Sequence, residues 1–258
     1  MHKKLEKLED IIASKKSLIV AHSGGVDSTF LLFVANRVLG DKALGLTVST
    51  PYIASWELEE AISVAKEIKA NHRVLQLPLI DEIKTNPPLR CYTCKSALFS
   101  YLLNYAKEHG YLHVSEGSNV DDTSEFRPGR RALAELDITT PLLEAGLYKS
   151  EIRALSHEFN LSTWDKPSYA CLLTRFEHNH LVNKEEFDMV GNAEGYLIKN
   201  GFRQIRVRFQ DFNARVEMPS NDVKRLLDSE KLEEIITYLK NLGFKNVSLD
   251  LPKILQTR

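Results

Sequence analysis

The sequence predicts an α/β protein with a doubly wound, mostly parallel sheet and a small C-terminal α+β domain. Two observations support this fold class. Between residues 17 and 120, short apolar runs typical of strands alternate with longer stretches typical of helices. From about residue 176 the order changes to a helix, two strands, one or two further helices and a last strand. We therefore expect a first domain at residues 1–175 and a second at residues 176–258.

The elements of the first domain follow in order. MHKKLEKLEDII has the charge and apolar spacing of an amphipathic helix, LIVA is a strand, and DSTFLLFVANRVLG is a helix that Gly40 stops. The alternation continues with ALGLTVS, ASWELEEAISVAKEIKA, HRVLQLPL, KSALFSYLLNYAKEHG and YLHVSEGSN. Strands that alternate with helices predict a parallel sheet. Residues 121–168 form loops around one helix, Lys149 to Phe159, and loops commonly contain functional residues.

The second domain begins with a helix at Lys184, where Asn183 and Glu186 have the spacing of a capping pair. RQIRVRF and ARVEM predict two strands, and NVSLDL predicts the last one. The sequence has no internal repeat. These features together predict the small α+β domain.

Composition narrows the function classes. The formal net charge of −1 does not favour nucleic acid as a partner. We find no apolar run of membrane-spanning length and no signal-peptide core, so we expect a cytoplasmic protein with no membrane partner. The chain has three cysteines, which cannot all pair. Few thiols in a reducing compartment favour metal binding or catalysis over a disulfide framework.

The stretch SGGVDS lies between the first strand and the following helix. Two glycines allow a tight turn that brings backbone N–H groups close to an anion, and the helix start adds partial positive charge. The stretch lacks the lysine of a Walker A loop and does not match the dinucleotide fingerprint. It predicts a phosphate site, with a plain glycine-rich turn as the alternative. The residues expected to form this phosphate site are Ser23, Gly24, Gly25, Asp27 and Ser28, and the family resemblance given below implies that the phosphate is that of ATP.

The cysteines occur in two places. Cys91 and Cys94 form a CxxC in RCYTCK, which we expect ahead of a helix. Cys171 lies in WDKPSYACLLTR, where the positive charges of Lys166 and Arg175 favour a thiolate. The CxxC could also be half of a zinc site, a redox pair or a structural pair of thiols, and Cys171 could be a small buried apolar residue.

SGGVDS resembles the signature of the PP-loop ATP pyrophosphatases, which include argininosuccinate, GMP and NAD synthetases and several thiolases. The resemblance implies that the protein binds ATP with Mg²⁺. It also implies that the protein transfers AMP to a carbonyl oxygen of its substrate and releases pyrophosphate. His22 departs from many relatives, which have a small or apolar residue there.

A longer series of motifs, from about residue 17 to 218, resembles the LarE family of sulfur transferases. The series is SGGVDS, RCYTCK, EGSNVDD with FRPGRRA, PLLEAGLYKSEIR, WDKPSYACLLTR, and RVRF with ARVE. The resemblance implies that carboxylates of pyridinium-3,5-biscarboxylic acid mononucleotide are adenylated and then converted to thiocarboxylates for the nickel-pincer cofactor. Cys171 falls at the family's sulfur-donor cysteine.

Some members of that family use only this donor and lose its sulfur to the product. Others have a CxxC and resemble thiolases that hold a 4Fe-4S cluster on three cysteines. The resemblance therefore implies a cluster on Cys91, Cys94 and Cys171, with the fourth iron open to carry sulfide from an external donor. Sacrifice of Cys171 without a cluster remains the alternative.

The resemblance also implies roles for further residues. Lys95 and Asp122 are expected in catalysis, and the expected substrate-binding residues are Arg127, Arg206, Arg208, Glu194 and Glu217. The two arginines of RVRF alternate along a strand, so both face one side, where two guanidinium groups can hold one phosphate. The turn that follows, FQDFNARVE, departs from the family pattern.

The family assembles into homo-oligomers such as hexamers, so we expect a homo-oligomer here. A cluster-dependent tRNA thiolase is the competing enzyme class, and a nucleotide-binding regulator is the competing non-enzyme. Near-neutral charge and the WDKPSYAC motif favour the sulfur transferase. The client enzyme of the cofactor is not specified by the sequence.

Overall fold

The computed structural model describes residues 1–123 and 128–250 and confirms the α/β fold class. The chain forms two compact units. Unit 1 consists of Met1–Thr50, Glu57–Ile83 and Pro88–Ser168, and unit 2 consists of Pro51–Trp56, Lys84–Pro87 and Tyr169–Arg258. The main division thus lies at 168/169, whereas the sequence predicts it at 175/176, and Cys171 belongs to unit 2. Among the described residues, every helix is too short or too polar to cross a bilayer.

Two early segments join unit 2 through backbone hydrogen bonds that the local sequence does not reveal. The N–H of Leu172 donates to the carbonyl of Tyr52 at 3.0 Å, and the N–H of Val182 donates to the carbonyl of Lys84 at 3.0 Å. Asn86 is fully buried, and its amide donates to the carbonyls of Phe176 and Glu177. These contacts explain why each unit consists of several separate segments of the chain.

The sheet of unit 1 is parallel and has the strand order β3-β2-β1-β4. The strands are β1 (Leu18–Ala21), β2 (Ala43–Ser49), β3 (His72–Gln76) and β4 (His113–Ser115). Because the chain continues from β1 to one side and later returns to the other side at β4, the order reverses between these two strands. In open parallel sheets, ligands bind beyond the carboxyl ends of the strands at such a point.

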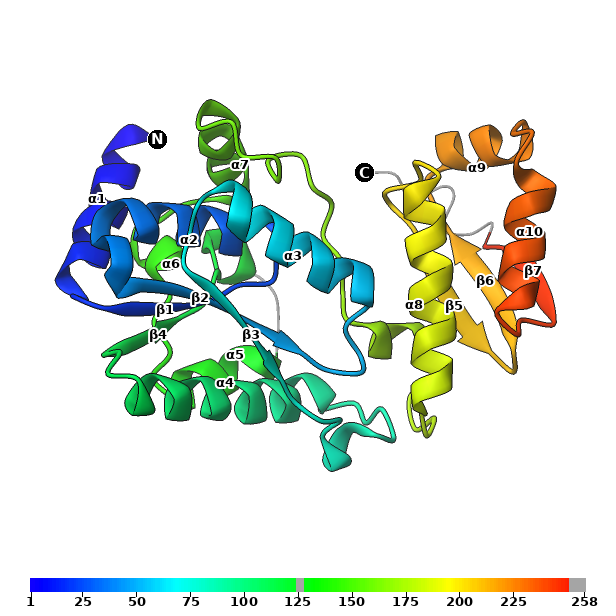
Figure 1. The fold of residues 1–258 in the computed structure, drawn as a ribbon, viewed down its shortest axis with the longest axis horizontal. Coiled ribbons are helices and arrows are strands. Elements are labelled where there is room, and N and C mark those ends of the chain that lie inside the picture. The colour runs from blue at the N-terminus through cyan, green and yellow to red at the C-terminus, as the bar shows by residue number, and fades with distance from the viewer. Residues whose placement is uncertain (124–127, 251–258) are drawn as a thin grey trace. The chain divides into compact units, whose positions relative to one another are not determined.

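Helices cover both faces of this sheet (Figure 1). One face packs against α1 (His2–Ser14), α2 (Val26–Leu39), α6 (Pro141–Glu144) and α7 (Lys149–Glu158), with Phe30 and Leu142 fully buried in that core. The helix α3 (Ser55–Glu67) lies beside α2 (Figure 1). The other face packs against α4 (Arg90–Glu108) and α5 (Pro128–Glu135), around Phe99 and Leu102. The doubly wound prediction is confirmed.

The helix α4 begins earlier than the sequence predicts. We expected the CxxC ahead of this helix, but α4 starts at Arg90, so Cys91 and Cys94 both lie in its first turns. Pro87 and Pro88 precede the helix, and proline limits how far a helix extends toward its N-terminus. The two thiols are therefore one helical turn apart.

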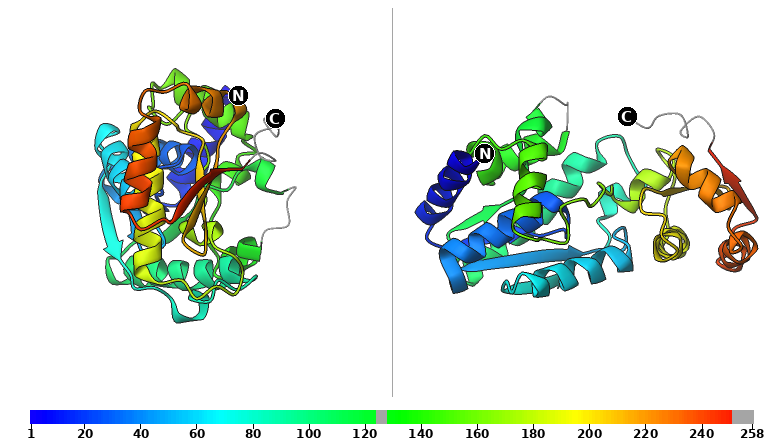
Figure 2. Two further views of the ribbon diagram at one scale, coloured as in Figure 1. Left: turned by 90° about the vertical axis from the view of Figure 1, so that its right-hand side faces the viewer. Right: turned by 90° about the horizontal axis from the view of Figure 1, so that it is seen from above.

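Unit 2 is the expected α+β domain. Its sheet has the order β5-β6-β7, with β5 (Arg206–Gln210) antiparallel to β6 (Asn213–Glu217) and β6 parallel to β7 (Asn246–Leu249). The helices α8 (Lys184–Lys199) and α10 (Leu232–Asn241) lie on one face of this sheet, and α9 (Ser220–Leu227) follows β6 (Figure 2). The predicted capping pair is confirmed, because Asn183 and Glu186 exchange hydrogen bonds at the start of α8.

Candidate active site

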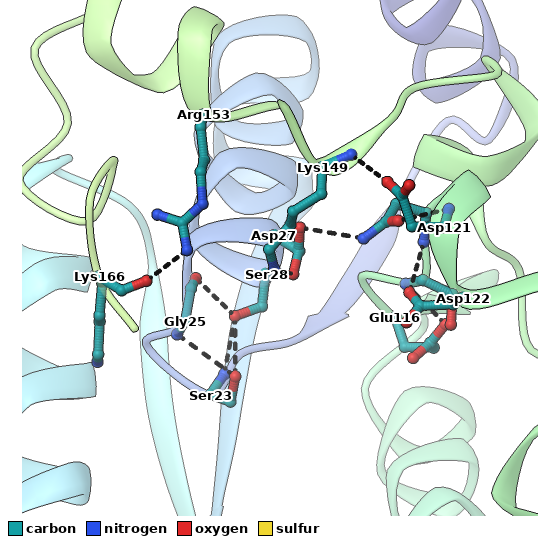
Figure 3. Close-up of polar contacts among 12 residues, drawn as sticks. Ser23, Gly25, Asp27, Ser28, Glu116, Asp121, Asp122, Lys149, Arg153 and Lys166 are labelled. Carbon is teal, nitrogen blue, oxygen red and sulfur yellow. Dashed lines mark hydrogen bonds and ion pairs between the residues drawn. The ribbon is translucent and has the colours of Figure 1, made fainter. Parts of the chain in front are cut away.

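The loop of SGGVDS connects β1 to α2 at the expected place (Figure 3). Gly24 has a positive φ of 70°, a conformation that only glycine adopts at little cost. A Cβ atom at Gly24 would lie 2.8 Å from the Cα atom of Ala61 in α3, closer than real Cβ contacts. Gly25 is the N-cap residue of α2. The loop therefore needs its first glycine for both conformation and close packing.

The two serines close the loop on itself. The hydroxyl oxygens of Ser23 and Ser28 lie 3.1 Å apart, and the N–H of Ser23 donates to Ser28 Oγ at 3.2 Å. Ser28 Oγ also donates to the carbonyl of Gly25 at 3.3 Å. The N–H of Gly25 makes only a long contact, 3.4 Å, with Ser23 Oγ. The loop thus has a defined shape while this N–H remains weakly bound, as an anion site requires.

Asp27 faces a lysine from a distant part of the chain. Its carboxylate forms an ion pair with Lys149 at the start of α7 and accepts a hydrogen bond from Asn119 Nδ2 at 3.3 Å. Burial raises the pKa of Asp27, the neighbouring Lys149 opposes that rise, and the nearby Asp122 adds to it. Our sequence analysis did not identify Lys149 or Asn119 as site residues. Their only signal was their place in the PLLEAGLYKSEIR and EGSNVDD motifs.

The loop that follows β4 brings further carboxylates to this region (Figure 3). Asp122 accepts a hydrogen bond from the N–H of Asn119 at 3.0 Å, and Asp121 accepts one from the N–H of Lys149 at 2.6 Å. Lys95 of α4 forms an ion pair with Glu116 at 3.6 Å. The structure therefore brings Asp122 into electrostatic contact with Asp27, whereas Lys95 pairs with a different carboxylate.

The donor set suits Mg²⁺, which usually takes one or two carboxylates together with phosphate and water oxygens. The charge of Asp122 adds to the rise in the pKa of Asp27, and a divalent cation would relieve this repulsion. Among the described residues, no group of three or more His, Cys, Asp or Glu side chains is placed to hold a metal ion. A Mg²⁺ site in which ATP phosphates supply the remaining ligands does not need three such side chains.

The spacing of Cys91 and Cys94 along α4 suits a shared metal centre. Side chains three residues apart on a helix lie on the same face. Cys91 is exposed and Cys94 is half-buried, so an incoming group can reach this face. Cys171, the third expected ligand, belongs to unit 2.

Cys171 lies directly before a short 3₁₀ helix, Leu172–Arg175, and is half-buried. Its carbonyl accepts hydrogen bonds from the N–H of Thr174 at 3.0 Å and from Thr174 Oγ1 at 2.9 Å. The guanidinium of Arg175 donates to the carbonyl of Ala170 at 3.1 Å. The backbone is therefore held on both sides of the sulfur.

Arg175 also forms a fully buried ion pair with Glu194 of α8. Two hydrogen bonds, of 2.7 and 3.0 Å, join two nitrogens of the guanidinium to the two oxygens of the carboxylate, and neither side chain has any exposed surface. Glu194 Oε1 accepts a further hydrogen bond from the N–H of Val207 in β5 at 2.8 Å. These contacts favour a role for Glu194 in holding the thiol segment. Direct contact with substrate stays a prediction.

Arg206 and Arg208 lie on one face of β5, because they alternate with the buried Val207. Arg208 forms an ion pair with Glu217 of β6 at 2.7 Å and also donates to the carbonyl of Thr174. Within residues 1–123 and 128–250, Arg206 has no hydrogen-bond or ion-pair partner.

Burial lowers the pKa of the Arg206 guanidinium, and the neighbouring Arg175 and Arg208 lower it further. Arg206 is therefore the arginine of this face whose charge is available to an anion. Arg127, the other predicted arginine, lies outside the described residues.

The doubly wound sheet and the glycine loop at its switch point are the features of the PP-loop class of α/β proteins. Over a shorter stretch the chain is similar to an NH₃-dependent NAD⁺ synthetase of Pyrococcus furiosus, with 32% identity over 28% of each chain. No protein-family profile matches the chain.

Two relatives match nearly the whole chain. An uncharacterized protein of Synechocystis sp. is 36% identical over 97% of this chain and 94% of its own length. The pyridinium-3,5-bisthiocarboxylic acid mononucleotide synthase of Lactiplantibacillus plantarum is 33% identical over 95% of this chain and 90% of its own. The chain belongs to the LarE family, as the sequence motifs predict.

Proposed function

We propose that the protein is an ATP-dependent sulfur transferase acting on pyridinium-3,5-biscarboxylic acid mononucleotide. In this reaction it adenylates the carboxylates of the substrate and converts them to thiocarboxylates. The main support is the similarity to the Lactiplantibacillus plantarum synthase over almost the entire chain. The glycine loop of unit 1 and the held thiol of unit 2 supply the two groups that this reaction needs.

In the first step, the loop and the start of α2 bind the phosphates of ATP through backbone N–H groups. An oxygen of the substrate carboxylate attacks the α-phosphorus, the bond to the pyrophosphate oxygen breaks, and an acyl adenylate forms. Asp27 and Asp122 would hold Mg²⁺, which offsets the negative charge of the phosphates. Asp27 would hold the metal as a carboxylate, and Lys149 orients this carboxylate through their ion pair.

In the second step, a sulfur nucleophile attacks the acyl carbon and AMP leaves with the electrons of the broken C–O bond. Cys171 is the proposed site of this chemistry. Cys91, Cys94 and Cys171 would hold the proposed cluster, which would supply replaceable sulfide. Without it, the sulfur of Cys171 itself enters the product, the bond from sulfur to Cβ breaks with loss of the α-proton, and dehydroalanine remains.

Arg206 is the proposed partner of the substrate phosphate, since among the described residues its guanidinium makes no hydrogen bond or ion pair, although the charges of Glu217 and Glu194 oppose those of Arg175 and Arg208 around it. Arg208 and Arg127 are proposed to assist, while Glu217 holds Arg208 in place. Lys95 is proposed to act near the adenylate. We also propose that an external donor provides the sulfide and that the protein assembles into a homo-oligomer.

The test uses the full chain purified without oxygen. Incubation with ATP, Mg²⁺, sulfide and the pyridinium mononucleotide should yield AMP, pyrophosphate and thiocarboxylate. Cys171→Ala should still release pyrophosphate but form no thiocarboxylate, and Asp27→Ala should release neither. If pyrophosphate release requires tRNA and does not depend on the pyridinium compound, the substrate assignment is wrong and the protein is a tRNA thiolase.

Iron analysis of the same protein separates the two sulfur mechanisms. About four irons with acid-labile sulfide per chain, and repeated turnovers, are expected for a 4Fe-4S centre. Cys91→Ser and Cys94→Ser should lose that iron. Protein without iron that gives one thiocarboxylate per chain, with dehydroalanine at position 171, would contradict the cluster and support sacrifice of Cys171.

A further inference from the structure

A buried lysine contacts the glycine loop from outside the SGGVDS motif. Lys166 is only 6% exposed, and its Nζ donates to the carbonyl of Gly24 at 2.8 Å. The same ammonium forms an ion pair with Glu60 of α3 at 2.9 Å. All three residues belong to unit 1. The contact joins positions 142 residues apart in the chain.

The backbone that carries this lysine is itself held in place. Arg153 of α7 donates to the carbonyl of Lys166 at 2.7 Å (Figure 3). It also donates to the carbonyl of Trp164 at 2.6 Å. The N–H of Lys166 donates to the carbonyl of Thr163 at 3.0 Å. Because both the backbone and the side chain are fixed, the ammonium is a rigid support for the loop.

The contact at Gly24 determines the direction of a neighbouring donor. The carbonyl of Gly24 and the N–H of Gly25 belong to one planar, trans peptide group, so they point in opposite directions. This peptide joins two glycines, which are the residues that resist rotation of a peptide plane least. Holding the carbonyl on one side therefore holds the N–H on the other.

The loop itself uses that N–H only weakly. Its contact with Ser23 Oγ is long, at 3.4 Å, and lies at the exposed side of the loop. It also belongs to the N-cap residue of α2, where the positive end of the helix favours an anion. A phosphate oxygen is the chemical group that would accept a hydrogen bond from this N–H.

We propose that Lys166 is a positioning residue for the phosphates of ATP, which holds the Gly24–Gly25 peptide so that the Gly25 N–H faces the phosphate site. The loop has no lysine of its own, and Lys166 supplies a fixed positive charge behind it. The charge also reaches the end of β1, where it contributes to the lowered pKa of His22. This inference rests on the proposed use of ATP.

The test compares ATP with AMP, which lacks the pyrophosphate that the loop is proposed to hold. Lys166→Met keeps most of the apolar stem and removes the ammonium. We expect the dissociation constant of ATP to rise about 10- to 100-fold, the size of one lost charge-assisted hydrogen bond, while that of AMP stays within about twofold. Isothermal titration calorimetry with each nucleotide and Mg²⁺ measures both.

Glu60→Gln is the matched control, because it removes the charged partner of Lys166 and leaves the contact with Gly24. It should bind ATP within about threefold of the unchanged protein. If Lys166→Met binds ATP as well as the unchanged protein, or loses ATP and AMP equally, the inference is wrong. If Lys166→Met does not fold, Lys166→Arg, which keeps the charge and alters the contact, should show the same selective loss in smaller size. If the unchanged protein binds no ATP, the proposed function fails instead.

Discussion

Protonation of His22 should destabilise the fold at mildly acidic pH. This residue follows β1 and directly precedes the glycine loop, and its side chain is almost fully buried. Its ring Nε2 lies 3.3 Å from Thr29 Oγ1, and its ring meets that of His72 edge-on. Burial, together with the neighbouring His72 and Lys166, lowers the pKa of His22 from 6.5 to about 3. The folded protein therefore holds this imidazole neutral.

The sign of the effect follows from the two pKa values of His22. Below pH 6.5, His22 binds a proton in the unfolded chain but not in the folded chain. The free energy of unfolding therefore falls as the pH falls toward 3. The effect is absent above pH 7. One pKa unit corresponds to about 1.4 kcal/mol, so the loss at pH 5 is about 2 kcal/mol.

Urea unfolding of the full chain at pH 8 and pH 5, followed by circular dichroism, measures this loss. His22→Phe keeps an aromatic ring that cannot be protonated, and every other titrating group is common to both proteins. The unchanged protein should lose about 2 kcal/mol more than His22→Phe between the two pH values. Equal losses in the two proteins would refute the assignment of a buried, neutral His22.

Four further substitutions, of which Gly25→Ala is a control, test the packing of the loop and of unit 2. Gly24→Ala should destabilise the protein by more than about 1–2 kcal/mol in thermal unfolding, because the left-handed backbone and the close helix α3 both oppose a Cβ atom. Gly25→Ala should cost much less, because Gly25 has an ordinary φ of −80°. Glu194→Gln should lower the free energy of unfolding by about 3–5 kcal/mol because it leaves the charge of Arg175 buried without its partner, and an unchanged urea midpoint would contradict this. Asn86→Ala should cost about 2–3 kcal/mol in the same measurement, since two carbonyls lose their donor, and a cost near zero would mean that water replaces the amide.

The alternation of strands and helices could be predicted from the sequence because it depends on neighbours a few residues apart. The same is true of the glycine loop, the capping pair of Asn183 and Glu186, and the shared face of Arg206 and Arg208. Each follows from the local period of a helix or strand, or from the freedom of a glycine. The start of α4 was wrong because local propensity defines helix ends poorly.

The partners within the site were decided by the tertiary structure. Lys149 reaches Asp27 across 122 positions, and Lys166 reaches Gly24 across 142. The division of the chain at 168/169 likewise depends on backbone contacts made by segments near residues 52 and 84. A local pattern identifies a residue that needs a partner, but which partner it meets depends on how helices pack over the sheet. The sequence by itself thus determined the place and shape of the glycine loop, and only the folded chain determined which cations contact it.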